Sequence, residues 1–122
     1  MSSQALISVI DDDASVRQAV ISLLRSLGLK GLGFDSAEAF LESGELQSTR
    51  LVITDIHMPG MSGIDLKREL DAKGSTVPVI MITAKTEEAV LQRARASNPS
   101  YLLKKPFDSD EFVACVERAL AL

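Results

Sequence analysis

The sequence contains no tryptophan, a single tyrosine and a single cysteine, Cys115. One cysteine cannot form an internal disulfide, so the chain fits a reducing compartment better than a secreted, disulfide-stabilised class. No histidine lies near Cys115 in the sequence. We therefore expect this residue to fill a core or helix-face position rather than to act as a nucleophile.

Long hydrophobic runs and clusters of basic residues are also missing. No apolar stretch approaches the roughly 18 residues of a membrane span, and no charged-then-apolar leader is recognisable. The net charge is -4, whereas contacts to nucleic-acid phosphates need clustered Lys and Arg. The sequence thus predicts a cytoplasmic domain without membrane contact and without direct nucleic-acid contact, although a separate DNA-binding domain is not excluded.

The 122 residues are 46% hydrophobic, which is enough for one domain with a substantial core, spanning residues 1–122. Short apolar runs alternate with segments of helical periodicity. The expected strands are 5–10, 29–34, 50–54, 79–82 and 100–104, and the expected helices are 14–27, 37–43, 63–72, 86–97 and 109–121. Continuous apolar strands separated by helices predict a parallel sheet covered on both faces. We expect a doubly wound, flavodoxin-like (βα)5 sandwich with strand order 2-1-3-4-5.

Helix-end signals support these boundaries. Asp13, Ser36 and Asp108 stand where N-cap residues belong, and Asp108 has the spacing of a capping box with Glu111. In the first helix the apolar stripe that should face the core consists of Val16, Val20, Leu23, Leu24 and Leu27.

Carboxylates follow two strands that this order makes neighbours. Asp11 and Asp12 come after the first strand, and Asp55 comes after the third. The carboxyl ends of parallel strands meet at one edge of the sheet, so these acids should crowd together. Like charges at such short range repel, and oxygen-only ligands suit Mg²⁺. The sequence predicts a magnesium site at this edge, with Mn²⁺ as an alternative ion.

Two further strand ends complete a set suited to phosphoryl transfer. Thr83 follows the fourth strand and offers a hydroxyl, and Lys105 follows the fifth and offers an ammonium group. A carboxylate such as Asp55 can accept a phosphoryl group as an acyl phosphate. This chemistry asks the protein mainly for positioning and charge neutralisation, which a metal ion and a lysine supply.

Four segments together resemble the receiver domain of bacterial two-component response regulators. They are VIDDD (9–13), VITDIHMPGMSGIDL (52–66), VIMITAK (79–85) and LLKKPFD (102–108). The resemblance covers about residues 5–120, and the subtype most resembled precedes a LuxR-type helix-turn-helix. It implies that Asp55 is the phosphoacceptor and that a sensor histidine kinase is the phosphodonor.

The resemblance also implies roles for the residues around Asp55. Asp11 and Asp12 would bind Mg²⁺ together with Asp55, and the backbone carbonyl of His57 would be a further ligand. The phosphoryl oxygens would be held by Thr83 and Lys105, and the Lys105–Pro106 bond would be cis.

His57 and Lys85 each stand two positions beyond a site residue. His57 is the only histidine, but a side chain at the mouth of the site is the preferred interpretation over a metal ligand or catalytic base. Lys85 would be its counterpart across the site. We expect this pair to set the lifetime of the acyl phosphate by modulating the access of water.

Two positions depart from the family pattern. Leu102 stands where the family usually carries Phe or Tyr, and Tyr101 is one residue away, so it should face the other side of its strand. A threonine-to-aromatic switch is therefore in doubt, although both residues lie on the expected output face. Asn98–Pro99 replaces the common Gly-Ala, and Pro99 should stiffen that turn.

Several alternatives remain open from sequence. The chain is either a stand-alone receiver or the receiver of a transcription regulator whose output domain is not included, and it either switches by phosphorylation or only docks. A phosphorylation-dependent homodimer is a further expectation. An Mg²⁺-dependent aspartyl phosphatase would need a second acid where His57 stands, and a flavin module would need a phosphate loop less acidic than DDDAS (11–15). We expect no enzyme activity beyond self-directed phosphoryl chemistry.

Overall fold

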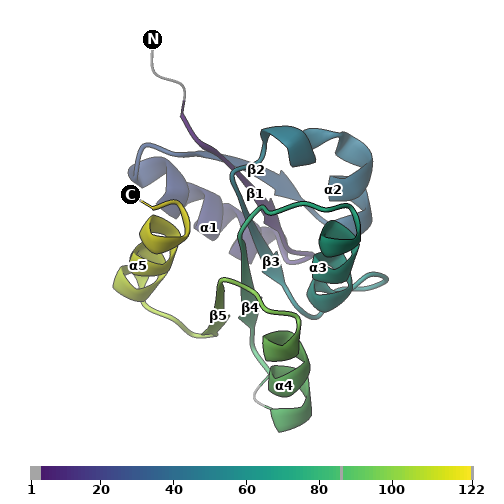
Figure 1. The fold of residues 1–122 in the computed structure, drawn as a ribbon. Helices are drawn as coiled ribbons and strands as arrows, with labels where there is room; N and C mark the ends of the chain where they lie inside the picture. Colours follow the sequence, from purple (N-terminus) through teal and green to yellow (C-terminus); the bar gives the residue numbers. More distant parts are fainter. Residues whose placement is uncertain (1–3, 86, 122) are drawn as a thin grey trace.

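The computed structural model describes residues 4–85 and 87–121. It contains a five-stranded sheet between two layers of helices (Figure 1). The strands are β1 (Leu6–Ile10), β2 (Lys30–Phe34), β3 (Leu51–Asp55), β4 (Val79–Thr83) and β5 (Tyr101–Lys104). All pairs are parallel and the order is β2-β1-β3-β4-β5. The predicted flavodoxin-like topology is confirmed.

The helices cover both faces of the sheet, as the apolar strands require. They are α1 (Ala14–Ser26), α2 (Ala37–Ser43), α3 (Gly63–Ala72), α4 (Glu88–Ala96) and α5 (Ser109–Ala119). One core lies under α1 and α5, around Leu24 and Phe112, and the other lies under α2, α3 and α4, around Phe40 and Leu66. A short 3₁₀ helix, η1 (Glu45–Ser48), was not expected from the sequence.

The predicted N-caps are confirmed. An Asp13 carboxylate oxygen accepts from Ser15 N at 2.9 Å, Ser36 Oγ accepts from Ala39 N, and Asp108 Oδ1 accepts from Glu111 N. The reciprocal capping box is found at α3, where Ser62 and Asp65 each accept from the backbone of the other.

The strand boundaries differ from the prediction by one residue at most, and the larger differences concern the helices. Leu27 lies outside α1 as its C-cap and is 36% exposed, because Gly28 turns the chain at φ 77°. Ile21, absent from the predicted stripe, is buried instead. The expected start of α4 at Thr86 falls outside the described residues, and the helix begins at Glu88. The last helix ends at Ala119, two residues early.

A buried polar contact joins β1 to the segment before β3. Ser8 is fully buried and its hydroxyl lies 2.8 Å from that of Thr49. Thr49 Oγ1 donates to the carbonyl oxygen of Glu45 at 2.7 Å, so the Ser8 hydroxyl is left to donate to Thr49. Both hydroxyls are thereby satisfied in an otherwise apolar layer.

Candidate functional site

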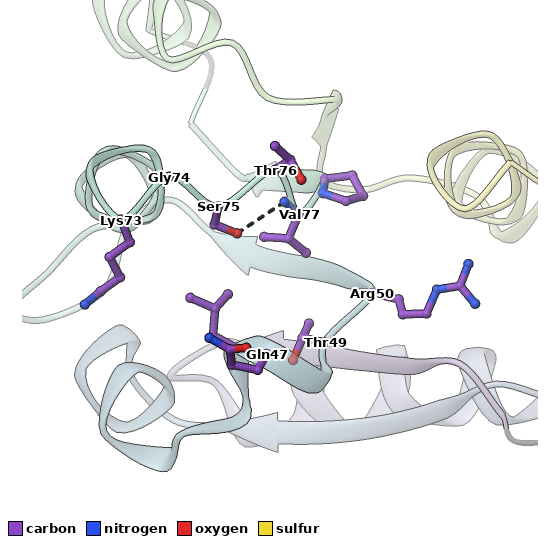
Figure 2. A pocket seen from close by; sticks show the side chains of 10 residues that line it. Gln47, Thr49, Arg50, Lys73, Gly74, Ser75, Thr76 and Val77 are labelled. Carbon is purple, nitrogen blue, oxygen red and sulfur yellow. Dashed lines mark hydrogen bonds between the residues drawn. The ribbon is translucent and has the colours of Figure 1, made fainter.

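A cavity of about 670 Å³ lies at the amino ends of β3 and β4, away from the three clustered acids (Figure 2). Two cations, Arg50 and Lys73, line it, and their side chains point away from each other. The remaining described lining residues are polar or apolar, and none is acidic. The charged side chains do not converge on one point where a ligand could bind. We therefore look elsewhere for the functional site.

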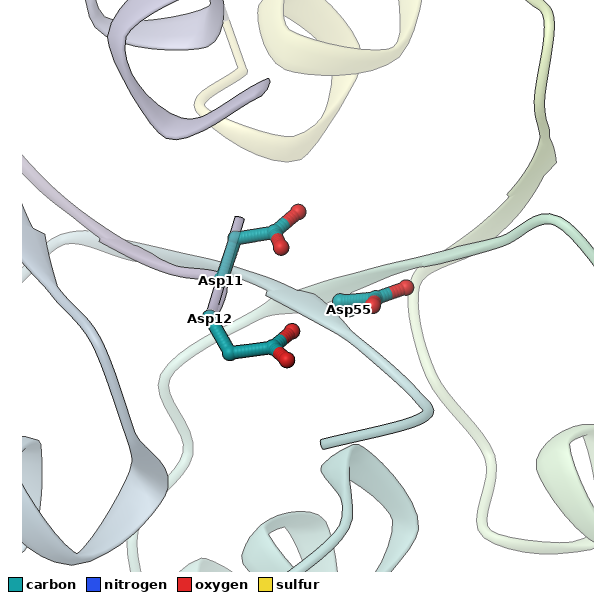
Figure 3. Close-up of side chains that lie close together, drawn as sticks. All are labelled: Asp11, Asp12 and Asp55. Carbon is teal, nitrogen blue, oxygen red and sulfur yellow. The ribbon is translucent and has the colours of Figure 1, made fainter. Parts of the chain in front are cut away.

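The carboxyl ends of β1 and β3 bring three carboxylates together. Ile10 pairs in register with Thr54, which places Asp11 and Asp12 beside Asp55. One oxygen from each carboxylate lies within 4.8 Å of the others. Figure 3 shows the three side chains pointing the same way across the end of the sheet. The structure therefore assembles the predicted acidic cluster.

The loop after β1 fixes Asp11. Its side chain is almost fully buried, and one oxygen accepts from Asp13 N at 2.9 Å. Its backbone carbonyl accepts from Arg17 Nη1 at 2.6 Å. Asp12 is exposed. The cluster thus has one tightly held carboxylate and one facing solvent, which suits a partly hydrated ion such as Mg²⁺.

Lys105 supplies positive charge to this cluster. Its ammonium nitrogen lies 3.6 Å from Asp11 Oδ2 and 3.7 Å from Asp55 Oδ1. The Lys105 amide donates to the Thr83 carbonyl at 2.8 Å, and the Lys105–Pro106 bond is cis, as predicted. The lysine predicted to bind a phosphoryl group therefore lies next to the predicted acceptor.

Burial raises the pKa of the Asp55 carboxyl, Lys105 opposes this shift, and the neighbouring Asp11 and Asp12 reinforce it. The site carries three carboxylates against one ammonium group, so it is short of positive charge. A divalent cation would remove this deficit and favour ionised Asp55.

Thr83 lies at the end of β4, fully buried. Its hydroxyl oxygen accepts from Lys85 N at 3.0 Å, whereas the contact to Lys85 O is 3.5 Å. That long contact holds the hydroxyl hydrogen weakly, so it is available to a nearer acceptor. The side chains of His57 and Lys85 are exposed beside this edge.

The loop between β3 and α3 is tightly closed. Gly63 N donates to Ile56 O at 2.9 Å, and a Cβ at position 63 would clash with the carbonyl oxygen of Asp55. Glu38, on α2, accepts from Met61 N at 2.9 Å. Sequence reasoning missed Glu38, Arg17 and Gly63 as site-supporting residues, because only the fold shows which distant backbone groups they meet.

Residues 7–117 match the family described as response regulator receiver domain. The chain is 37% identical over 114 residues to the transcriptional regulatory protein FixJ of Azorhizobium caulinodans, covering 93% of this chain and 54% of that protein. It superposes on the response regulator StyR with a TM-score of 0.88 at 34% identity, covering 98% of this chain and 60% of that one. Superposition on a response regulator receiver protein from Burkholderia phymatum gives a TM-score of 0.85 at 36% identity. It covers 98% of this chain and 97% of that one.

The chain belongs to the response regulator receiver family. It spans about half the length of the curated relatives it matches. None of the described helices of this receiver is long and apolar enough to cross a bilayer.

This receiver places the two residues of the predicted output face on opposite sides of β5. Leu102 packs with the core under α2, α3 and α4, whereas Tyr101 packs with the core under α1 and α5. The sequence expectation that they face apart is confirmed. The side chain on the α4 side of β5 is therefore that of Leu102, which has no aromatic ring or hydroxyl that could rotate as part of a switch.

Proposed function

We propose that this receiver accepts a phosphoryl group on Asp55 from the phosphohistidine of a sensor histidine kinase. The observation that supports this most directly is the position of Asp55, whose carboxylate lies within 4.8 Å of two further acids and 3.7 Å from Lys105 Nζ. Family membership makes a histidine kinase the expected donor. In this reaction an Asp55 oxygen forms a bond to phosphorus while the bond from phosphorus to the histidine nitrogen breaks.

We infer that Mg²⁺, or Mn²⁺ in its place, is held by Asp11, Asp12, Asp55 and the backbone carbonyl of His57. The three clustered carboxylates support this assignment. When bound, the ion neutralises negative charge that the acids and the incoming phosphoryl group place at one edge of the sheet. The phosphoryl group itself would be positioned by side chains of the protein.

Lys105 and Thr83 would hold the phosphoryl oxygens. The ammonium group already faces Asp55, and the weakly held Thr83 hydroxyl can turn toward a phosphoryl oxygen. His57 and Lys85 are the side chains that would govern water access and hence the lifetime of the acyl phosphate. This chemistry acts on the receiver itself, so we assign no turnover of an external substrate.

Phosphorylation would switch a partner-binding face formed by α4, β5 and α5 by shifting a two-state equilibrium. Residues 1–122 form one receiver domain in this proposal. The whole protein would act in the cytoplasm and control transcription through a DNA-binding output domain, as the relatives' description as transcriptional regulators supports. The receiver itself would contact no nucleic acid.

The deciding experiment is intact mass after incubation with a small acyl-phosphate donor, with and without Mg²⁺. We expect a gain of one phosphoryl group that requires Mg²⁺ and is absent in Asp55→Asn. Asp13→Asn is the matched control, because Asp13 caps α1 and is not part of the cluster. No adduct from either the small donor or a phosphorylated kinase would instead indicate a receiver used only for docking.

We also propose that phosphorylation promotes a homodimer. Charged residues of both signs lie on and beside the proposed face, including Arg95, Lys104, Glu111 and Arg118, which permits complementary pairing between two copies. Sedimentation should show a shift from monomer to dimer on addition of a phosphoryl mimic. A monomer under both conditions would contradict this part of the proposal.

A further inference from the structure

We propose that Glu38, on helix α2, is a positioning residue for the metal site. Its carboxylate holds the loop that follows Asp55. This inference rests on the proposed function, since it concerns how well the receiver binds its metal ion. Glu38 itself touches none of the three clustered acids among the contacts described.

The contact between Glu38 and the loop is specific. Glu38 Oε2 accepts from Met61 N at 2.9 Å, across 23 residues of sequence. The same oxygen lies 2.5 Å from where a Cβ on Gly60 would stand, and Gly60 has φ 78°. Glycine at position 60 is thus needed both for the turn and for the approach of the carboxylate.

Glu38 projects from a firmly held helix. Its neighbour Ala37 and the nearby Phe40 are fully buried, and the Phe40 ring packs edge-on against Phe34 with centroids 5.3 Å apart. Ser36 caps the first turn. Movement of the carboxylate would therefore require movement of α2 or a change of the Glu38 rotamer.

The backbone of this loop has few other hydrogen bonds, although the Met58 side chain is buried in the core. Ile56 N donates to Ile82 O at one end, and Gly63 N donates to Ile56 O at the other. Between these points, within the described part of the chain, the hydrogen bond from Met61 to Glu38 is the only one that reaches the backbone of residues 57–61. This stretch includes the His57 carbonyl assigned above to the metal ion.

The charge of Glu38 strengthens the contact. The hydrogen bond from the Met61 backbone holds the pKa of the Glu38 carboxyl below its usual value, so the group is ionised at neutral pH. A backbone N–H bond to an ionised carboxylate is stronger than one to a neutral oxygen. Without it, the loop would sample more conformations, and binding of a metal ion would have to order them.

The test compares Glu38→Ala, Glu38→Gln and Glu42→Ala. Glu42 is the matched control, because it lies one turn further along α2, is exposed, and its carboxylate makes no hydrogen bond or ion pair with any described residue. Two quantities are measured on each protein. They are the hydrogen-exchange rate of the Met61 amide without metal, by NMR, and the dissociation constant for Mg²⁺, by calorimetry.

We expect Glu38→Ala to exchange the Met61 amide about tenfold faster. The dissociation constant for Mg²⁺ should rise about tenfold, as for other groups that support a metal ligand from outside. Glu38→Gln should give values between those of Glu38→Ala and the wild type in both measurements, because its amide oxygen can still accept the hydrogen bond from Met61 N. Glu42→Ala should match the wild type in both measurements.

Faster Met61 exchange with an unchanged Mg²⁺ constant would overturn the inference, since Glu38 would then support only the loop. Unchanged exchange would overturn it as well. In both cases wild-type phosphorylation on Asp55 would leave the proposed function intact. A wild-type protein that neither binds Mg²⁺ nor accepts a phosphoryl group would overturn the proposed function, and this inference with it.

Discussion

The Lys105 ammonium nitrogen lies 3.7 Å from an Asp55 carboxylate oxygen, within reach of any group attached to that oxygen. Lys105→Met should slow phosphoryl uptake from a small donor about a hundredfold, because a fixed donor to the transferred group is lost. Intact mass against time measures this rate. Lys104→Met is the control, since Lys104 is exposed and absent from the ion pairs of the site. Equal rates for the two variants would rule out a role for Lys105 in transfer.

The acidic cluster should weaken the metal-free fold. Burial raises the Asp55 pKa, so the folded state holds that proton more tightly than the unfolded chain does. Ionisation of Asp55 therefore destabilises the fold as the pH rises above the unfolded pKa of about 3.9 and through the folded value. In chelator at pH 7, Asp55→Asn should raise the unfolding free energy by about 1 kcal/mol, or roughly 4 °C in Tm.

That gain from Asp55→Asn should shrink steadily as the pH is lowered toward 3, below the unfolded pKa of about 3.9, where the wild-type carboxyl is protonated in both states. Thermal unfolding at the two pH values measures it. A variant less stable than the wild type in chelator at pH 7 would contradict this account.

The acyl phosphate should become shorter-lived when the exposed side chains at the mouth of the site are removed. His57→Ala and Lys85→Ala should each raise the dephosphorylation rate several-fold, because water would approach the phosphorus atom more freely. The rate is measured by following loss of the phosphorylated mass after removal of the donor. Rates equal to the wild type in both variants would show that neither side chain controls the lifetime.

Asp65, in the capping box of α3, makes a pH-dependent contribution to stability that is opposite in sign to that of Asp55. Hydrogen bonds from the backbone and side chain of Ser62 lower the Asp65 pKa, so ionised Asp65 stabilises the fold above the unfolded pKa. That contribution is lost as the pH falls through the folded value. At pH 7, Asp65→Asn should cost about 0.5–1 kcal/mol by urea unfolding, and almost nothing near pH 2. Glu69→Gln, exposed on the same helix, should show no such trend.

Gly63→Ala should destabilise the protein although position 63 is helical. In an exposed helix the change to alanine stabilises by about 1 kcal/mol. Here the added methyl group would collide with the carbonyl oxygen of Asp55 and displace the end of β3 or the start of α3. We expect a loss of about 2 kcal/mol in urea unfolding. A gain in stability would mean that the loop yields easily.

The strands and the clustering of the acids could both be predicted from the sequence, and both predictions rest on the same pattern. Short apolar runs such as Leu51–Thr54, alternating along the chain with helical segments, indicate buried parallel strands, and the carboxyl ends of such strands meet at one edge of the sheet. Asp11, Asp12, Asp55 and Lys105 were therefore predicted as neighbours without coordinates, and the structure brings them together.

The supporting contacts were not predictable in this way. Arg17 bonds to the Asp11 carbonyl and Glu38 to the Met61 amide, and backbone atoms carry no residue-specific signal in a sequence. The outward turn of Leu27 was missed for a related reason. Its position continues the helical period, but the helix stops one residue earlier, and Leu29 enters the core in its place.

The buried hydroxyl pair of Ser8 and Thr49 has a consequence for the carboxyl ends of β1 and β3. A slip of β1 against β3 by one residue would separate these two hydroxyls and leave both unsatisfied in an apolar layer. The same slip would displace Asp11 from Asp55 by about 3.3 Å. A hydroxyl pair that takes no part in the chemistry thus fixes the register of β1 against β3, and this register keeps the acids at the ends of the two strands side by side.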